Sequence, residues 1–560
     1  MRLLIKITFI LLSISAYGQS IRIDGNFDDW ANINPVFVDD LNDGQSNGID
    51  LERVWAYNDQ SFLYFRFELN KEINLQDNND LAIYLDFDDD INTGFKINGI
   101  GAEVRIFFGD RQGILSVGNN TDFVNFWPLG LNVSPSVSGS DFEIAVSRSI
   151  SESGLNINAE SVISFRLEDN GFNGDEAPSD LGGIDYNVDN SIITENPEFD
   201  LNIDPNATFR IMTYNIEDDQ LFEPFRKQNF RRIFQATNPD IIALQEVRDF
   251  NSEETMELIE EFLPGTWFHK KHGFDIVTIS RYPINFSEFI NGNAAFYLDV
   301  DGKEILLINC HLPCCDNNSD RQREVDGIMS YIREARNGNE DYFLAEDTPI
   351  IIAGDMNFVG DNSQPNTFIT GDIFANGTYG EDFVPDWDGT NFDDVDASTT
   401  GTSSNFTWVN PFGSFFPSKL DWIIYSGSQM KVQNSFALWT EAMTNSELNE
   451  YNLSSGDILN AADHLPVVAD FNFSTVSTDE FISLDVNIYP NPVTDKMYLE
   501  LEEMISSDFT IYNAEGLKIK SISNDGSKIQ VLDLGELVAG QYYILFQGDN
   551  GRMAKGFIKI

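Results

Sequence analysis

Polar side chains of the kinds used in catalysis stand at the ends of apolar runs in the middle of this 560-residue chain. The runs and their polar residues are "IMTYNI" (Asn215), "DIIALQEV" (Glu246), "EILLINCHL" (His311), "PIIIAGDMN" (Asp355, Asn357), "KLDWIIY" (Asp421) and "AADHLPVVADF" (Asp463, His464). Each apolar run predicts a buried strand, so each polar residue is expected at the rim of a sheet, where rigid elements present catalytic groups. Clustered carboxylate and amide oxygens suit Mg²⁺, and carboxylates beside histidines can hold and transfer protons. A single one of these residues would be more typical of a turn or a helix cap.

The elements around these residues divide the chain into three segments, which predicts a multidomain protein. Residues 20–203 hold strand-length apolar pieces separated by Asn, Asp and Gly turns, and we expect an all-β sandwich. Over residues 207–473 such strands alternate with helical stretches, "FRKQNFRRIFQA" and "QREVDGIMSYIREA", which indicates mixed α/β structure. Residues 484–560 are short strands and turns, typical of a small β-sandwich. Polar linkers separate the three segments.

The chain begins with a secretory signal, which we assign to residues 1–18. Arg2 and Lys6 precede a short apolar core, and a small-residue cleavage site ends at Gly18. The apolar core is too short to cross a membrane, and no later stretch reaches the length that a transmembrane helix needs. We therefore expect an exported protein without a membrane anchor, whose cysteines meet an oxidising setting.

A net charge of −57 distinguishes the composition, and residues 207–473 hold 16 Lys and Arg against 43 Asp and Glu. Such a field repels nucleic acids and anionic membranes and attracts cations, although an acidic surface also simply keeps an exported protein soluble. Arg226, Lys227, Arg231 and Arg232 form a small basic patch, which is more typical of a solvated helix face than of a binding groove.

The order of the polar sites resembles that of the endonuclease/exonuclease/phosphatase superfamily of metal-dependent phosphodiesterases. The matching motifs are "TYNI", "LQEV", "NCHL", "GDMN", "LDWII" and "ADHLPV", together with "SRYPI" at residues 280–284, and they cover about 207–473. The resemblance implies a four-layer α/β sandwich in which two packed sheets are flanked by helices. It also implies hydrolysis of a phosphoric ester bond.

The resemblance assigns a role to each site residue and implies Mg²⁺ as the cofactor, with Mn²⁺ or Ca²⁺ as alternatives. Glu246 would be the main metal ligand, with Asn215 and Asp463 close by. Asp355 would orient or deprotonate the attacking water. The remaining residues would bind the phosphoryl group: Asn357 and His311 as hydrogen-bond donors, and His464 as an imidazolium held by Asp421. The identity of the general base stays open.

His269 and His272 are the two histidines outside these motifs. Their spacing could place both on one helix face as a metal pair, but no third ligand is near and Lys270 and Lys271 oppose a cation. We expect a surface loop instead.

All three cysteines, Cys310, Cys314 and Cys315, lie within six residues of one another and surround His311. They cannot wrap one ion tetrahedrally, because the adjacent pair diverges and structural zinc sites need well-spaced ligands. The interpretation that we favour is structural: the cysteines shape the loop after His311. A Cys314–Cys315 link or a longer bridge from Cys310 both remain open, and either leaves an odd thiol.

The N-terminal segment, with "IRIDGNFDDWANI", "LYFRFEL" and "AIYLDFDDDINTG", resembles family-nine-like carbohydrate-binding modules and DOMON-like sandwiches. Trp30, Trp55 and Trp127 could stack on a polysaccharide, although core packing is the commoner role of Trp in a sandwich. Asp86, Asp88, Asp90 and Asn92 alternate in a pattern that suits a structural Ca²⁺ ion. A plain acidic turn fits equally well, because the segment lacks the Gly and Glu of an EF-hand loop.

The C-terminal segment, with "VNIYPNPVTDKMYLEL" and "LVAGQYYILFQGDNGRMAKGFIKI", resembles the type A sorting domain of the type nine secretion system. This resemblance implies that the export machinery is a partner and that the protein works outside the cell or on its surface.

These observations predict a secreted, Mg²⁺-dependent phosphodiesterase, and an extracellular nuclease acting on DNA or RNA is the leading hypothesis. Because the catalytic segment is so acidic, sphingomyelinase-like action on a phospholipid head group or hydrolysis of a small phosphoester is the main alternative. A non-catalytic binding protein is the third reading, and the completeness of the motif set argues against it.

Overall fold

The computed structural model describes residues 20–41, 48–171, 174–194, 197–474, 486–501, 509–513, 518–523, 527–548 and 551–560. The chain forms two compact units, Met1–Ser474 and Thr475–Ile560. The signal peptide expected at residues 1–18 lies outside the described residues. Among the described residues, no helix is long and apolar enough to cross a membrane.

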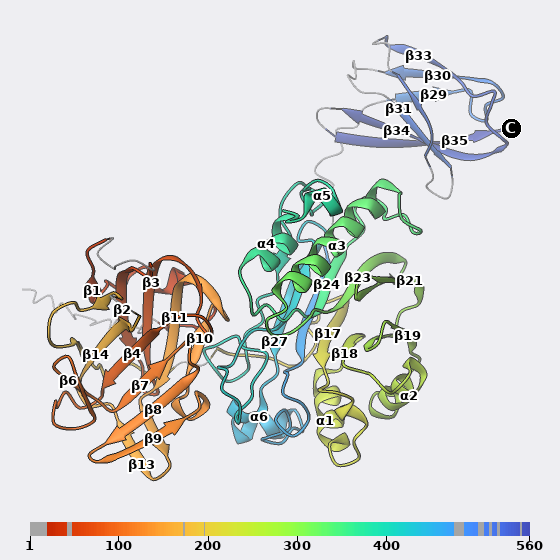
Figure 1. The fold of residues 1–560 in the computed structure, drawn as a ribbon. Helices are drawn as coiled ribbons and strands as arrows, with labels where there is room; N and C mark the ends of the chain where they lie inside the picture. The colour runs from red at the N-terminus through yellow and green to blue at the C-terminus, as the bar shows by residue number, and fades with distance from the viewer. Residues whose placement is uncertain are drawn as a thin grey trace, which may run out of the picture. The chain divides into compact units, whose positions relative to one another are not determined.

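The N-terminal part of the first unit is built from β-strands in two packed sheets, as predicted (Figure 1). One sheet has the order β1 (Phe37–Val38), β2 (Leu51–Asn58), β3 (Phe62–Asn74), β11 (Ser138–Ser147) and β10 (Asn132–Ser134). The other has the order β15 (Glu176–Ala177), β14 (Val162–Asp169), β4 (Leu81–Asp86), β7 (Val104–Phe107), β8 (Gln112–Val117) and β9 (Asn120–Val124), and β16 (Ile184–Asn187) also pairs with β14. Smaller elements are β5 (Phe95–Ile97) with β6 (Ile100–Ala102), β12 (Ser149–Glu152) with β13 (Leu155–Asn158), and the 3₁₀ helices η1 (Phe27–Trp30) and η2 (Trp127–Leu129).

Two of the tryptophans considered as sugar platforms belong to the interior of this β region. Trp30 is 1% exposed and donates its indole N–H to Glu143 at 2.9 Å. Trp55 is 4% exposed and donates to the carbonyl of Ile33 at 3.1 Å. A buried indole whose N–H is already bonded contributes packing area rather than a binding surface.

Two six-stranded sheets pack face to face in the central part of the first unit. One has the order β19 (Phe268–His272), β20 (Ile276–Ser280), β18 (Ile241–Gln245), β17 (Phe209–Asn215), β28 (Val467–Phe473) and β27 (Met430–Ala437). The other has the order β21 (Ile284–Ile290), β22 (Asn293–Val300), β23 (Lys303–His311), β24 (Ile350–Asp355), β26 (Asp421–Tyr425) and β25 (Asp393–Asp394). The helices are α1 (Lys227–Thr237), α2 (Ser252–Phe262), α3 (Asn318–Asn337), α4 (Ser363–Thr370), α5 (Asn376–Tyr379) and α6 (Asn445–Glu450), with the 3₁₀ helices η3 (Gln220–Phe222) and η4 (Thr440–Ala442).

Alternation along β23 shows how these layers stack. Leu307 packs into the cluster that the two sheets share, whereas its neighbours Leu306 and Ile308 pack with Val325 and Ile328 of α3. Successive side chains of a strand point to opposite faces, so β23 lies between the other sheet and α3. Helices α1 and α2 contribute to the shared cluster from the side of β17 and β18. The four-layer α/β sandwich expected from the sequence is confirmed.

Strand register brings the carboxyl ends of four strands to one rim. β17 runs parallel to β18 with Asn215 opposite Gln245, and β23 runs parallel to β24 with His311 opposite Asp355. β26 runs antiparallel to β24, so its first residue, Asp421, lies opposite Asp355. Gly354 allows this close pairing, because a Cβ there would collide with the carbonyl of Cys310 and its φ is +151°.

The N-terminal β region and the central sheets meet inside the first unit. Ile23 forms a parallel β-bridge with Ser404, and Phe416 packs in the hydrophobic core of the N-terminal sheets. The division between residues 203 and 207, expected from the sequence as a domain boundary, stays a prediction.

The C-terminal unit holds two small sheets that enclose their own hydrophobic cluster, in line with the sandwich expected there. One has the order β29 (Val486–Tyr489), β30 (Lys496–Leu501) and β33 (Ile529–Asp533). The other has the order β32 (Lys518–Ile522), β31 (Phe509–Asn513), β34 (Gly540–Gly548) and β35 (Gly551–Lys559).

We predict that the buried ion pair between Arg210 on β17 and Asp470 on β28 is essential to the first unit. Their side chains are 1% and 0% exposed, and the guanidinium also donates to the carbonyls of Leu201 and Thr237. Asp470→Asn leaves the buried Arg210 charge uncompensated, so the free energy of unfolding should fall by about 3–5 kcal/mol. Denaturant titration followed by tryptophan fluorescence measures this, because all eight tryptophans lie in the first unit.

The matched control is Asp320→Asn, which removes an exposed partner of Arg323 on α3. An exposed pair contributes about 0–1 kcal/mol, so the control should change little. Equal effects of the two substitutions would contradict the prediction.

Candidate active site

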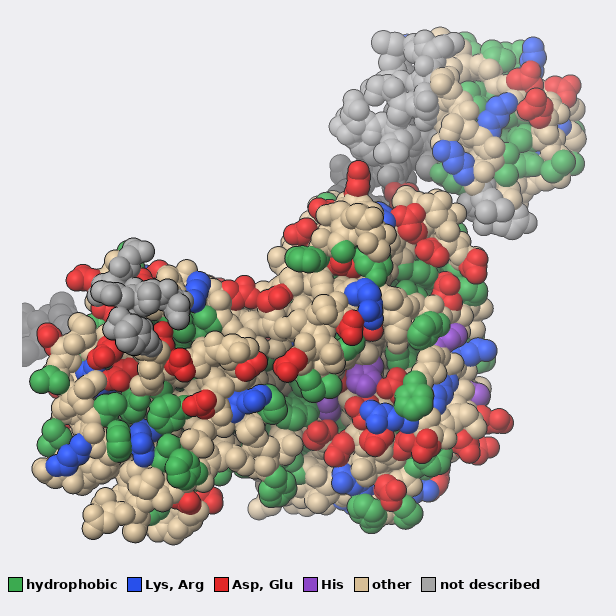
Figure 2. Space-filling view, in the orientation of Figure 1, with side chains coloured by type: hydrophobic (Ala, Val, Ile, Leu, Met, Phe, Trp, Pro, Cys, Tyr) green, Lys and Arg blue, Asp and Glu red, His purple; other side chains and the backbone are tan. Residues whose placement is uncertain are grey.

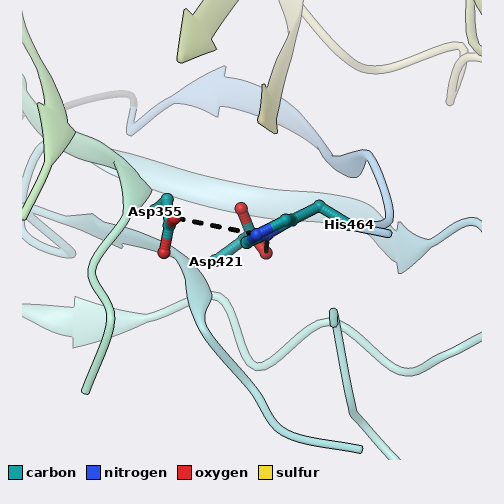
Figure 3. A group of neighbouring side chains, drawn as sticks. All are labelled: Asp355, Asp421 and His464. Atoms are coloured by element: carbon teal, nitrogen blue, oxygen red, sulfur yellow. Dashed lines mark hydrogen bonds and ion pairs between the residues drawn. The ribbon is translucent and has the colours of Figure 1, made fainter. Parts of the chain in front are cut away.

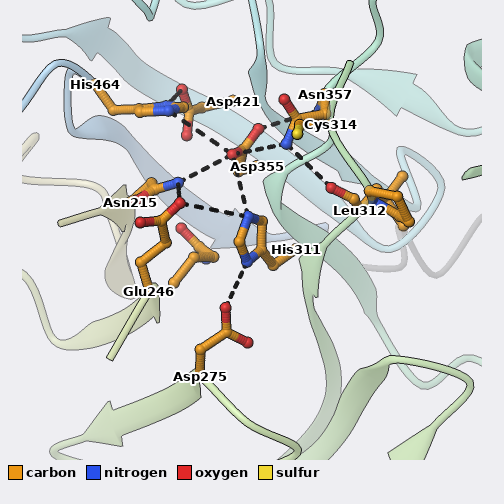
Figure 4. Close-up of polar contacts among 12 residues, drawn as sticks. Asn215, Glu246, Asp275, His311, Leu312, Cys314, Asp355, Asn357, Asp421 and His464 are labelled. Carbon is orange, nitrogen blue, oxygen red and sulfur yellow. Dashed lines mark hydrogen bonds and ion pairs between the residues drawn. The ribbon is translucent and has the colours of Figure 1, made fainter. Parts of the chain in front are cut away.

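Most of the residues singled out at the strand ends converge on one rim of the central sheets (Figure 4). The side chains that contact one another directly there are Asn215, Glu246, His311, Asp355, Asn357, Asp421 and His464. Asn215 ends β17, His311 ends β23 and Asp355 ends β24, while Glu246 follows β18 directly. Residues more than 240 positions apart in the chain therefore form one group of polar side chains.

Asp355 lies at the centre of this group and is 1% exposed. Its carboxylate accepts hydrogen bonds from the side-chain amides of Asn215 and Asn357, both at 3.0 Å, and from the backbone N–H of Asn357 at 3.1 Å. The Nε2 atoms of His311 and His464 lie 3.7 Å and 3.8 Å from its Oδ2 atom. A buried carboxylate is costly unless it is paired, and here two amides and two imidazoles compensate it.

Asp421 and His464 form a buried pair beside Asp355 (Figure 3). The Nδ1 atom of His464 lies 2.8 Å from Asp421 Oδ2, which also accepts the hydroxyl of Thr407 at 2.8 Å. Burial alone would lower the pKa of His464, but the carboxylates of Asp421 and Asp355 outweigh it and raise that pKa to about 10. The imidazole is therefore charged at neutral pH, and its Nε2–H faces the centre of the group.

Asp275 is a site residue that the sequence analysis missed. His311 Nδ1 lies 2.7 Å from Asp275 Oδ2, and the backbone N–H of His311 donates to Asn293 at 2.8 Å. Burial alone would lower the pKa of His311, but the hydrogen bond to Asp275 and the charge of Asp355 raise it. The two histidines of the site are thus each held by one aspartate. Asp275 stands just before β20, whose apolar run was the only available signal.

Glu246 occupies a strained backbone position with φ of +62°. Its Oε1 atom lies 3.3 Å from Asn215 Nδ2 and 3.8 Å from His311 Nε2, and its Oε2 accepts the backbone N–H of Asp218 at 2.7 Å. Left-handed conformations in non-glycine residues concentrate at functional sites, where the surrounding structure enforces them.

Asp463 lies in the same acidic region but outside this network of direct contacts. Its carboxylate accepts the indole N–H of Trp408 at 2.9 Å. Burial is the main cause that raises the pKa of Glu217, and the charge of Asp463 raises it further. Glu246 adds a smaller contribution in the same direction. Glu217 is a further carboxylate that the sequence analysis missed, and it forms a 3.1 Å ion pair with Arg226.

The donor set suits a hard divalent cation. Ligand atoms of Asp355, Asp421 and His464 lie within 4.8 Å of one another, and the carboxylate of Glu246 lies at the same rim, where Arg248 pairs with it at 3.5 Å. Oxygen ligands of this kind and number are those that Mg²⁺ accepts while it keeps several waters. Asn215 turns its amide nitrogen to the carboxylates, and its oxygen accepts the backbone N–H of Glu217 at 3.0 Å. Direct ligation by Asn215 stays a prediction.

The basic patch and the remaining histidines lie outside this group. Lys227 and Arg231 both pair with Glu261, and Arg232 pairs with Asp457, so three basic side chains share two carboxylates within the fold. His269 and His272 lie on β19, an edge strand, and not in the loop that we expected. Figure 2 shows acidic side chains over much of the visible surface and histidines that reach the surface of the central region.

A second acidic cluster lies in the N-terminal β region. Oxygen atoms of Asp86, Asp88 and Glu103 all lie within 4.8 Å of one another. Asp86 is 1% exposed, and its Oδ1 atom has no hydrogen-bond partner among the described residues. Burial raises the pKa of Glu103 to about 7. The sequence analysis found the two aspartates but missed Glu103, which the fold brings over from the start of β7.

We predict that Asp275→Asn lowers the pKa of His311, because the largest influence that raises it is removed while burial remains. NMR titration of the histidine ring signals, with a chelator present, measures this directly. Asp316→Asn is the matched control, because Asp316 is exposed in the loop after His311 and the change removes the same charge without that hydrogen bond. A His311 pKa that is unchanged in Asp275→Asn would contradict the assigned contact.

Two parts of the chain match known protein families. Residues 212–464 match the Endonuclease/Exonuclease/phosphatase family, and residues 487–560 match the Secretion system C-terminal sorting domain. No curated protein matches this chain.

Solved structures that are similar to about half of this chain include those of three different proteins. The human Nocturnin catalytic domain with bound sulfate is 18% identical, covers 48% of this chain and 94% of its own, and has a TM-score of 0.30. D. rerio TDP2 complexed with a single-strand DNA product is 16% identical, with 47% and 98% covered and a TM-score of 0.32. ANGEL2, described as a 2',3'-cyclic phosphatase and bound to adenosine-2',3'-vanadate, is 17% identical, with 47% and 95% covered and a TM-score of 0.32.

The sorting domain indicates export by type nine secretion to the cell surface or the extracellular space. The rim described above lies within the matched central residues, as do all eight candidate site residues of the sequence analysis. The chain therefore carries an endonuclease/exonuclease/phosphatase family domain over residues 212–464 and a secretion system C-terminal sorting domain over residues 487–560.

Proposed function

We propose that this protein is an exported, Mg²⁺-dependent phosphodiesterase, and that it acts outside the cell as a nuclease on DNA or RNA. The observation that carries the proposal is the arrangement of two aspartate-held histidines, His311 and His464, on either side of the buried carboxylate Asp355. Such an arrangement provides, in one place, a carboxylate that can hold a water molecule and two donors that can neutralise a phosphoryl group.

Glu246 is the proposed main metal ligand, and Asp463 and Asn215 complete its surroundings. Mg²⁺ is the expected ion, and Mn²⁺ or Ca²⁺ are the alternatives that oxygen donors also admit. The ion, when bound, supplies a positive charge that polarises the phosphoryl oxygens of the substrate. The backbone N–H of Asp218 holds one oxygen of Glu246, and the side-chain amide of Asn215 lies 3.3 Å from the other.

Asp355 has the proposed role of orienting or deprotonating the attacking water. The hydrogen bonds from Asn215 and Asn357 hold its carboxylate in one orientation. Asn357 is itself anchored, because its amide also donates to the carbonyl of Leu312 at 3.0 Å. A preorganised general base avoids reorganisation at the moment of reaction.

His464 and His311 have the proposed role of donors to the phosphoryl oxygens. Asp421 holds the ring of His464 by Nδ1 and keeps it charged, so that Nε2–H points toward Asp355 and the space in front of it. Asp275 likewise holds the ring of His311 by Nδ1, and this hydrogen bond raises the pKa of that histidine. Two fixed N–H donors complement the charge that develops on a pentacoordinate phosphorus.

Nucleic acid remains the leading hypothesis, and the pairing of the basic helix residues with Glu261 and Asp457 favours a substrate held mainly at the site itself rather than by many phosphate contacts. A phospholipid head group or a small phosphoester is the alternative that the acidic surface favours. Polysaccharide binding by the N-terminal β region stays a prediction, and the buried Trp30 and Trp55 give it no support.

A substrate panel tests the proposal: plasmid DNA, RNA, sphingomyelin and bis-nitrophenyl phosphate, each with Mg²⁺ and with a chelator. We expect turnover of at least one of them that the chelator abolishes and Mg²⁺ restores. Asp355→Asn and His464→Gln should each lower kcat by about 10²–10⁴-fold, since each removes a group that acts in the proton transfer or on the transition-state charge. His269→Gln is the matched control, because this histidine lies on the edge strand β19 and contacts Ser252 instead.

Turnover that survives both the chelator and the two substitutions would refute the mechanism. A folded protein that turns over no substrate of the panel would favour a binding role.

We also propose that Asp86, Asp88 and Glu103 hold the structural Ca²⁺ ion expected in the N-terminal β region. Three carboxylates within 4.8 Å, one with a buried oxygen that lacks a partner among the described residues, repel one another unless a cation compensates them. Ca²⁺ at about a hundredfold excess over its Kd should then raise Tm by roughly 3 °C, as measured by tryptophan fluorescence. Glu103→Gln should remove the Ca²⁺-dependent part of Tm, and an identical Ca²⁺ effect in this variant would refute the assignment.

A further inference from the structure

The three cysteines occupy two different environments. Cys310 lies in β23, is 0% exposed and packs in the cluster between β23 and α3. Burial raises the pKa of its thiol well above the usual value, so it stays unreactive. Cys314 and Cys315 are exposed in the turn after His311, and their Sγ atoms lie 2.7 Å apart. All three thiols are free in the structure.

The backbone around the adjacent pair is anchored on both sides. Before it, Leu312 donates its N–H to the carbonyl of Asp355 at 2.9 Å, and its own carbonyl accepts from Asn357 at 3.0 Å. Across it, the buried guanidinium of Arg321 donates to the carbonyls of Pro313 and Cys315. These contacts hold the two thiols against each other instead of letting them diverge, which corrects our expectation from their adjacency alone.

We propose that Cys314 and Cys315 are a redox modification site, at which the exported protein forms a reversible disulfide between neighbouring residues. The oxidant is a low-molecular-weight disulfide, R–S–S–R. One thiolate attacks it and releases one R–SH, and the second thiolate then attacks the mixed disulfide and releases the other. The two cysteines lose two protons and two electrons in total, and the oxidant takes up both.

Three observations support the pairing over the alternatives. The sorting domain places the protein at the cell surface or beyond, where disulfides persist. Cys310 is inaccessible, so it competes for neither partner. The Sγ atoms of Cys314 and Cys315 lie 2.7 Å apart, so a bond between them needs little movement of either side chain.

The bridge is expected to be easily reduced. Neighbouring Cα atoms are about 3.8 Å apart, whereas disulfides usually join Cα atoms about 4.4–6.8 Å apart. Such strain, together with exposure, makes a disulfide labile rather than permanent. Leu312, two residues before Cys314, accepts a hydrogen bond from Asn357 at 3.0 Å, so the bridge would form at the edge of the candidate active site (Figure 4).

Thiol counting and peptide mapping test the proposal without any measurement of turnover, so its outcome is independent of the proposed function. The full exported chain is incubated with oxidised glutathione, alkylated, denatured and alkylated again with a second reagent. We expect one remaining thiol, assigned to Cys310, and a peptide carrying Cys314 and Cys315 that has lost two hydrogen atoms. Reduced glutathione should reverse this without denaturation.

Cys314→Ser and Cys315→Ser are matched variants, and each should retain one accessible thiol that cannot form the bridge. Three free thiols in the oxidised wild-type chain would overturn the proposal. A stable glutathione adduct on Cys314, or a dimer linked through Cys315, would overturn it equally, because either shows that the two sulfurs do not reach each other. Peptide mapping of the unaltered chain decides the question even if a variant fails to fold.

Discussion

The burial of one carboxylate, Asp355, is the constraint on which the site depends. A charge at 1% exposure needs compensation, and the fold provides it from four directions: Asn215, Asn357, His311 and His464. These residues come from β17, from the loop after β24, from β23 and from the segment before β28, so both sheets must be in register for the charge to be tolerated. The same arrangement places two imidazole N–H groups around the space where a phosphoryl group would lie. The contacts that stabilise the buried carboxylate therefore also fix the positions of the two imidazole N–H groups.

Each imidazole is in turn held by its own carboxylate, and the two pairs differ in burial. Asp421 and His464 are both buried; burial alone would lower the pKa of His464, but the charges of Asp421 and Asp355 raise it to about 10. Asp275 and His311 are partly exposed, with side chains 15% and 17% exposed. Behind them, Gln245 donates to Asn309 at 2.8 Å across the gap between the two sheets, and both are 0% exposed. A polar contact between otherwise apolar sheets helps to fix their relative position beneath the rim.

The structure shows where the charged side chains of this acidic chain lie and which of them pair. Lys227, Arg231 and Arg232 of α1 share the carboxylates of Glu261 and Asp457, which reduces the positive charge that this helix offers to a polyanion. In the N-terminal β region, oxygen atoms of Asp86, Asp88 and Glu103 lie within 4.8 Å of one another. Such a cluster favours a cation, because its charges otherwise repel one another.

The sequence by itself determined the order of elements, the class of each segment and most of the site. Runs such as "IIALQ" and "IIIAG" are strand-length and apolar, and their polar ends have to emerge at a sheet rim whatever the topology. The motif order then identified eight candidate residues, seven of which contact one another directly. Asp463 was placed in the same region, where it contacts Trp408 instead.

Tertiary structure alone decided which side chains act as partners. Asp275 and Glu217 stand in no motif that we recognised, and Glu103 lies 13 residues beyond Asp90, the last aspartate of the acidic run that it joins. Pairing across strands sets such contacts, and no spacing along the chain encodes them. The cysteines illustrate the same limit. Their adjacency in the sequence predicts side chains that point apart, whereas Arg321 and Asn357 hold the backbone of the loop from two sides. Chain order determines which residues reach the rim, and register determines which of them meet.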